Sequence, residues 1–112
     1  MDIIIKGKRV DRECVVVIKS DHIAAPLDPH TDLVNHSPDG FEWGYTGSGP
    51  TQLAFAIMFE YAKSKFPLEI DAYKYAIAHY IKFRNDFIAN VQESMFEISF
   101  DQIEAWTQGE DR

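Results

Sequence analysis

The sequence has a single cysteine, no long hydrophobic run and few basic residues in its last third. One cysteine in 112 residues excludes an internal disulfide. No segment reaches the roughly 18–20 apolar residues that a membrane-spanning helix needs. The N-terminal residues also lack the basic lead-in and the apolar length of a signal peptide. We therefore expect a cytoplasmic protein with no membrane segment.

Basic residues are scarce in two regions of the chain. No Lys or Arg lies between Lys19 and Lys63, and residues 85–112 carry seven acidic side chains and one basic one, which is −6 of the total charge of −7. Binding to nucleic acid needs clustered Lys and Arg, so we expect no direct contact with nucleic acid. An acidic region suits a basic partner surface. The alternative is a solvated acidic face that aids solubility.

The composition is that of a globular protein. Hydrophobic residues make up 46% and aromatic residues 13% of the chain, which argues against disorder. Two separate cores would each be too small at this length, so we expect a single α+β domain over residues 1–112. Cys14 begins the apolar run Cys14–Ile18, where a thiol is expected to behave as a small buried hydrophobe.

The first part of the chain is predicted to be mainly strand. Ile3–Ile5 and Cys14–Ile18 are short β-branched runs, and His22–Leu27 is a weaker extended piece. The residues from Asp28 to Gly40 are rich in Pro, Asp, Asn and Ser, which predicts an ordered loop. Phe41–Tyr45 alternates aromatic residues with Glu and Gly and is predicted to be a strand.

The second half of the chain is predicted to be mainly helical. Pro50 suits the first position of a helix, and the run Leu53–Phe59 is apolar on every face, which predicts burial or an interface between two copies of the chain. A second helix is expected over about Asp71–Val91 and a strand over Met95–Ile98. Ser99-Phe100-Asp101-Gln102 matches a capping box and predicts a short final helix.

This order of elements, β-β-(β)-β-α-α-β-α, predicts an α+β fold. We expect a small antiparallel sheet with a buried helix and further helices packed on one face.

The most distinctive feature is the glycine-rich turn Gly47-Ser48-Gly49 before the first helix. Free backbone N–H groups and the positive helix end can bind an anion there, and Trp43 or Tyr45 could stack on a base beside it. The spacing matches neither a P-loop nor a dinucleotide turn. The alternative is a structural role, in which Gly47 and Gly49 only allow a tight turn and a local carboxylate or Ser48 caps the helix.

Cations for a phosphate at this turn would have to come from elsewhere in the chain. The candidates are Lys6, Lys8, Arg9 and Arg84.

Other candidate chemistry is weaker. The loop residues His30, Asp32, His36 and Asp39 match no zinc spacing, and we expect them to form turns and caps. Ser48 does not lie in a nucleophile elbow. We therefore expect no metal, no cofactor and no catalytic residue.

The segment from Asn35 to Ala54 resembles a small family classed only as a domain of unknown function. Its members are similar in pairing an NHSPxGFxWGY segment with a GSGPxQLAxAI helix start, and the resemblance extends upstream to Pro26-Leu27-Asp28-Pro29. Thr46 stands where the family more often has Gly. The family occurs in phages, archaea and bacteria, often in mobile elements. The resemblance implies a shared fold and supplies no activity.

Two functions of different classes follow as hypotheses. The first is a non-enzymatic binding protein, a mobile-element (phage-type) accessory or counter-defence factor that contacts a host or cellular protein through Glu97, Asp101 and Glu104. The alternative is a small-ligand or nucleotide-binding module that uses the glycine-rich turn. A homodimer is compatible with either.

Overall fold

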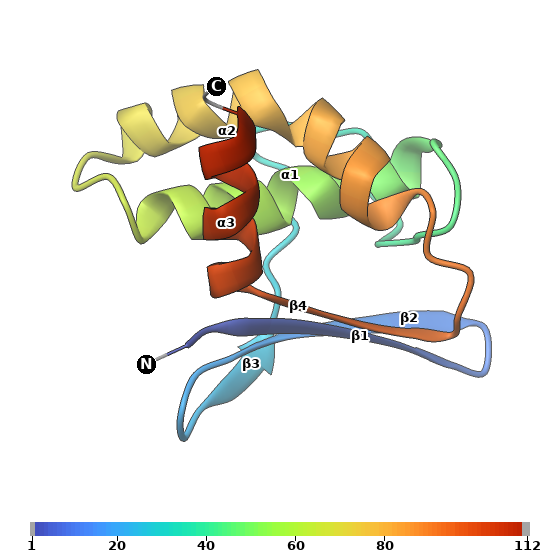
Figure 1. The fold of residues 1–112 in the computed structure, drawn as a ribbon. Coiled ribbons are helices and arrows are strands. Elements are labelled where there is room, and N and C mark those ends of the chain that lie inside the picture. Colours follow the sequence, from blue (N-terminus) through green and yellow to red (C-terminus); the bar gives the residue numbers. More distant parts are fainter. Residues whose placement is uncertain (1, 111–112) are drawn as a thin grey trace. The chain divides into compact units, whose positions relative to one another are not determined.

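A computed structural model describes residues 2–110, and the chain divides into two compact units. The first unit contains the residues up to Leu27 together with those from Ser94 onward, and the second contains Asp28–Glu93. The elements in chain order are β1 (Ile4–Val10), β2 (Glu13–Lys19), β3 (Ala24–Pro26), α1 (Ser48–Lys63), α2 (Glu69–Phe83), a π-helix (Arg84–Ile88), β4 (Met95–Ser99) and α3 (Phe100–Glu110) (Figure 1).

The first unit is built on a four-stranded antiparallel sheet with the order β3-β2-β1-β4. β1 and β2 form a hairpin in which Ile5 lies opposite Ile18. Asp11 in the connecting turn has a φ of 59°, a left-handed conformation that Asp tolerates better than most residues. β4 pairs with the other side of β1 and places Ile98 opposite Ile5. The sequence-distant β4 therefore completes the sheet.

The two faces of this sheet differ in burial because successive side chains of a strand point to opposite sides. Ile5, Val16 and Ile98 share one face and are at most 5% exposed. On the other face Val15 is 46% and Met95 60% exposed. We call this second side the open face, defined by Lys6, Lys8, Val10, Val15, Val17, Met95 and Glu97.

α3 begins directly at the end of β4 with the expected capping box. The Gln102 N–H donates to Ser99 Oγ at 3.0 Å, and the Ser99 N–H donates to Gln102 Oε1 at 2.8 Å. Each side chain thereby satisfies a backbone group that the helix leaves unpaired. Ile103 and Thr107, one turn apart, are the buried side of α3.

The second unit is a pair of helices, α1 and α2, that lie side by side and run in opposite directions (Figure 1). Every residue of α1 from Gly49 to Phe59 is buried, as an apolar run on all faces predicts. α2 is amphipathic and buries only Ala72, Ala76 and Phe83. Small residues at two of these three positions allow the helices to approach closely.

The α+β class is confirmed, and the order of elements is consistent with the expected one. The segment 41–45 is not a strand, because Gly44 has a φ of 95° and its N–H donates to Ile88 O at 3.0 Å. The first helix begins at Ser48 instead of Pro50, and Cys14 is only half-buried. The second helix starts at Glu69 and passes into the π-helix.

No helix formed by residues 2–110 is long and apolar enough to cross a membrane.

Candidate functional site

The glycine-rich turn closes the first turn of α1 through backbone groups. Gly47 is the N-cap, has extended dihedral angles (φ −90°, ψ −169°) and offers no side chain for capping. Its carbonyl oxygen accepts hydrogen bonds from the Thr51 N–H at 3.1 Å and from Thr51 Oγ1 at 2.7 Å. The first turn of α1 contains no acidic residue. The expected cap by Ser48 is therefore wrong, because Gly47 occupies the N-cap position and Ser48 is already helical.

Neither Gly47 nor Gly49 has a positive φ. The glycines with positive φ among the described residues are Gly40 (122°) and Gly44 (95°). Gly49 is needed for a different reason, since a Cβ atom there would lie 2.8 Å from Glu42 Cβ and 3.2 Å from the Glu42 backbone nitrogen. The glycine at this position lets the loop pack directly on the start of α1.

The two aromatic residues before the turn have opposite environments. Trp43 is 1% exposed, and its Nε1–H donates to Glu93 O at 3.0 Å, so its ring belongs to the core and cannot stack on a ligand. Tyr45 is 52% exposed. Ser48 is exposed at the first residue of α1. The predicted ligand-binding set is therefore split, with Tyr45 and Ser48 accessible and Trp43 enclosed.

A positively charged side chain, that of Arg84, reaches the N-terminal end of α1. Arg84 Nη1 donates to Thr51 Oγ1 at 3.0 Å, and the same guanidinium donates to Asn85 Oδ1 from Nε and Nη2. Arg84 is the first residue of the π-helix, a rare backbone form that often marks functional positions. Of the four cations considered from the sequence, Arg84 is the one in the same unit as the turn.

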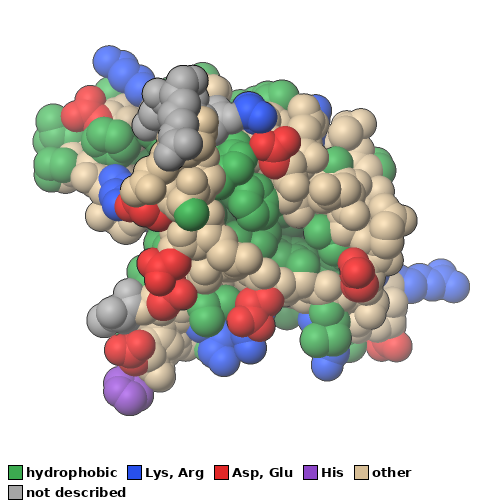
Figure 2. Space-filling view, viewed as in Figure 1, with side chains coloured by type: hydrophobic (Ala, Val, Ile, Leu, Met, Phe, Trp, Pro, Cys, Tyr) green, Lys and Arg blue, Asp and Glu red, His purple; other side chains and the backbone are tan. Residues whose placement is uncertain are grey.

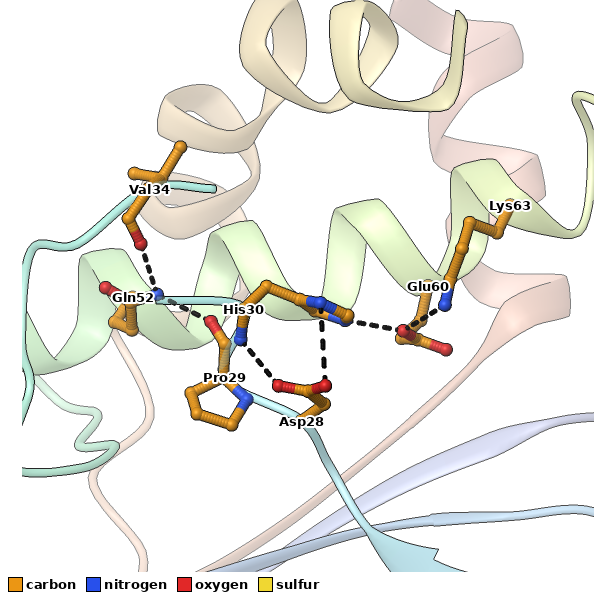
Figure 3. A network of polar contacts seen from close by, with 7 residues as sticks. All are labelled: Asp28, Pro29, His30, Val34, Gln52, Glu60 and Lys63. Atoms are coloured by element: carbon orange, nitrogen blue, oxygen red, sulfur yellow. Dashed lines mark hydrogen bonds and ion pairs between the residues drawn. The ribbon is translucent and has the colours of Figure 1, made fainter. Parts of the chain in front are cut away.

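A buried polar amide at Gln52 ties the preceding loop to α1 (Figure 3). Its Oε1 accepts from the N–H groups of His36 (2.7 Å) and Ser37 (3.2 Å), and its Nε2 donates to the carbonyls of Pro29 (2.6 Å) and Val34 (2.8 Å). The side chain is completely buried and fully hydrogen-bonded. A Gln inside an otherwise apolar helix was the sequence signal for it.

His30 makes a second polar tie to α1, near the other end of that helix (Figure 3). It is 7% exposed, has a φ of 56°, and its Nε2–H donates to Glu60 Oε2 at 2.6 Å. Lys63 Nζ lies 2.8 Å from the same Glu60 oxygen, and Asp28 Oδ1 accepts from the His30 N–H at 2.9 Å. The ring of His30 also packs edge-on against Phe59, with centroids 4.7 Å apart. Sequence reasoning missed the Glu60 pairing, since the two residues are far apart in the chain.

The ionisation of Glu60 reflects these contacts. Burial raises the pKa of Glu60, but the hydrogen bonds and charges of His30 and Lys63 outweigh it, so the pKa lies below that of an ordinary Glu. Glu60 is therefore ionised at neutral pH and accepts both contacts as a carboxylate.

The other loop residues considered as metal ligands do not join this cluster. His36 Nε2 lies 3.0 Å from Tyr80 Oη instead. Within residues 2–110 no group of three His, Cys, Asp or Glu side chains is arranged to hold a metal ion.

The three acidic residues proposed for partner binding come from two elements of the first unit. Glu97 lies on β4, opposite Lys6, whose Nζ is 3.5 Å from Glu97 Oε2. Asp101 is exposed in the first turn of α3, and Glu104 Oε2 lies 3.4 Å from Thr107 Oγ1 on the same helix. On the face drawn in Figure 2 the acidic side chains are scattered in separate groups and do not form one continuous patch. Glu97 and Glu104 thus each have a close polar neighbour within the first unit.

The open face carries a depression that the sequence analysis did not foresee. It has a volume of about 510 Å³ and is lined by side chains of β1, β2 and β4, with Lys6, Lys8 and Glu97 among them. Its apolar lining includes Val15 and Met95, both strongly exposed. The sequence did contain a signal for this depression. A strand with one solvated face normally shows only polar residues on that face, whereas β1 and β4 carry both apolar and charged residues there.

A family model described as "Family of unknown function (DUF6166)" matches residues 5–109. No curated protein and no solved structure matches the chain.

Proposed function

We propose that this chain, which belongs to the family of unknown function DUF6166, is a non-enzymatic binding protein that acts by contact with another protein. We further propose that it serves a mobile element of the phage type, as an accessory or counter-defence factor. The second step rests on the resemblance of its central motif to proteins of phages and other mobile elements.

The observation that supports a binding role is the apolar depression on the open face. Val10 and Val15 are each 46% exposed and Met95 is 60% exposed, all on one side of a small sheet. Contiguous exposed apolar surface rimmed by polar residues is typical of sites that contact another protein. The depression offers about 510 Å³, enough space for one or two apolar side chains of a partner.

The charges around the depression favour a partner segment that is apolar at its centre. Lys6 and Glu97 already pair with each other across the strands, so the rim is balanced there. Lys8 adds a positive charge on the same face, whereas Asp101 and Glu104 place negative charges on α3. We propose that burial in the depression supplies the affinity and that the surrounding charges orient the partner.

The test places a photo-crosslinking amino acid at Met95 and, as a matched control, at Ile23. Both positions carry an exposed apolar side chain in the first unit, and Ile23 lies outside the depression. We expect crosslinked protein from host lysate at position 95 and none at position 23. Equal crosslinking at both positions, or at neither, would contradict the proposal.

Two variants separate apolar from acidic contact. Val15→Asp puts a charge into the depression, whereas reversal of Asp101 and Glu104 to Lys changes α3 alone. We expect Val15→Asp to abolish capture of the crosslinked partner. The reversal should weaken capture only at low salt, because exposed charges are screened over about 8–10 Å at physiological ionic strength. A loss caused by the reversal alone would move the contact to α3.

A second candidate, binding of a small anionic ligand at the start of α1, is favoured by the position of Arg84. Its guanidinium lies in hydrogen-bond contact with Thr51 in the first turn of the helix. Titration with a nucleoside monophosphate, followed by NMR shifts of the residues 47–51, tests this alternative. Shifts that disappear in Arg84→Gln would support it, and unchanged spectra in the wild type would exclude that ligand.

A further inference from the structure

α2 has an apolar stripe on the side that faces away from its buried residues. Ile70, Ile77 and Ile81 recur at helical spacing and are 56%, 40% and 41% exposed. The buried side of the same helix is formed by Ala72 and Ala76 with Phe83. We call Ile70, Ile77 and Ile81 the isoleucine stripe. It lies in the second unit, whereas the open face belongs to the first, so a contact at the stripe does not require the function proposed for the open face.

A depression adjoins the first residue of this stripe. It has a volume of about 470 Å³ and is lined by Asp32, Leu33, Glu69, Ile70 and Tyr73. The lining combines the side chains of Leu33, Ile70 and Tyr73 with two carboxylates. It is suited to an aliphatic side chain whose own helix carries a positive charge nearby.

The other end of the isoleucine stripe has an aliphatic side chain with a positive charge beside it. Ile81 is followed by Lys82, and both are exposed. From these features we propose that the isoleucine stripe binds a second copy of this chain, with the two α2 helices antiparallel. In that arrangement Ile81 of one copy enters the depression beside Ile70 of the other, and Ile77 lies near the two-fold axis.

The charges along α2 favour the antiparallel direction. Asp71 and Lys82 are about three helical turns apart and therefore lie on the same flank of the stripe. Antiparallel pairing places Asp71 of each copy beside Lys82 of the other, where it joins the existing contact of Lys82 with Asp86 at 3.1 Å. In a parallel two-fold pair this flank would lie across from the opposite flank of the second copy, so Asp71 and Lys82 would not meet across the contact and the attraction between them would be absent.

The contact is isologous, since the same surface serves both copies. One short helix per chain gives a smaller interface than the roughly 800 Å² per partner of a standard complex, so we expect an association in the micromolar range.

Sedimentation equilibrium over a range of concentrations of the full chain tests the proposal. We expect a monomer–dimer equilibrium whose dissociation constant rises at least about 30-fold in Ile77→Asp, as for loss of a central apolar contact. Ile23→Asp, the same change at an exposed position of the first unit, should leave the constant unchanged. If Ile77→Asp fails to fold, as judged by circular dichroism, Ile81→Asp replaces it. A wild-type chain that stays monomeric, or a dimer unaffected by either stripe variant, would overturn the proposal.

Disulfide crosslinking determines the direction of the helices. In a Cys14→Ser background, a mixture of Ile70→Cys and Ile81→Cys chains should give the mixed disulfide, and Ile77→Cys alone should give a crosslinked dimer. Disulfides that join two Ile70→Cys chains or two Ile81→Cys chains, with no mixed disulfide between the two variants, would show parallel helices and contradict the proposed geometry.

Discussion

α1 and α2 are neighbouring helices of similar length, yet they use their hydrophobic residues differently. α1 is buried along almost all of its length and even its polar residue Gln52 is completely enclosed. α2 buries one narrow side and leaves Ile70, Ile77 and Ile81 at the surface. The contrast shows that the apolar composition of a helix does not by itself reveal whether its apolar side chains are buried in the core or exposed at the surface. The apolar side chains of α1 serve the core, whereas the isoleucine stripe of α2 remains for a contact outside the chain.

The largest expected effect compares the two helices directly. Ile57 in α1 is 0% exposed, so Ile57→Ala should lower the free energy of unfolding by about 2–5 kcal/mol through lost burial and the cavity that remains. Ile77→Ala in α2 should change it by less than about 0.5 kcal/mol when the protein is dilute enough to be monomeric. Urea denaturation of both variants measures this difference. Equal losses would mean that α2 is no less buried than α1.

The burial of α1 and several other local features were accessible from the sequence, because they depend on local pattern. The run Leu53–Phe59 predicted a helix buried on all sides, and Ser99 with Gln102 predicted the cap of α3. The β-branched runs Ile3–Ile5 and Cys14–Ile18 likewise predicted strands where β1 and β2 lie. Each of these signals lies within a few residues of the feature that it specifies.

The candidate sites were less accessible because they depend on contacts between distant segments. Trp43 looked available for stacking, but its environment is set by Glu93, which follows the π-helix. The pairing of His30 with Glu60 has no local signal for the same reason. The depression on the open face needs β4 beside β1, and the sequence does not specify which strands are neighbours.

The next effect tests the polar contacts of Glu60, which hold the loop before α1 to that helix. The described buried residues of α2 are all apolar and make no such side-chain contact. Glu60 has a lowered pKa in the folded protein, so its ionised form stabilises the fold at neutral pH, and this contribution is lost as the pH falls through that pKa. Glu60→Gln should therefore cost about 1–3 kcal/mol at neutral pH, by weakening the hydrogen bonds from His30 and Lys63. The difference from wild type should shrink in acid.

Urea denaturation at several pH values measures this dependence. Asp39→Asn removes an exposed carboxylate of the same unit and serves as the control, with little expected change at any pH. A Glu60→Gln penalty that is constant from neutral to acid pH would show that the loss comes from packing and does not involve the charge of Glu60.

The smallest effect concerns the loop before α1. It compares the contact of this loop with the segment after the π-helix, at Gly44, with its junction to α1, at Gly47. Gly44 has a φ of 95°, and a Cβ atom there would lie 2.9 Å from the carbonyl oxygen of Val91, after the π-helix. Gly44→Ala should therefore cost about 1–2 kcal/mol from the left-handed backbone, with a further cost from this contact. Gly47 has a negative φ, and the three atoms nearest to an added methyl group belong to the ring of Tyr45, which is 52% exposed and can turn aside. We expect Gly47→Ala to change the stability by less than about 0.5 kcal/mol. Thermal melts of the two variants distinguish these positions. A Gly47→Ala variant less stable than Gly44→Ala would show that the loop depends on its junction with α1 more than on the segment that follows α2.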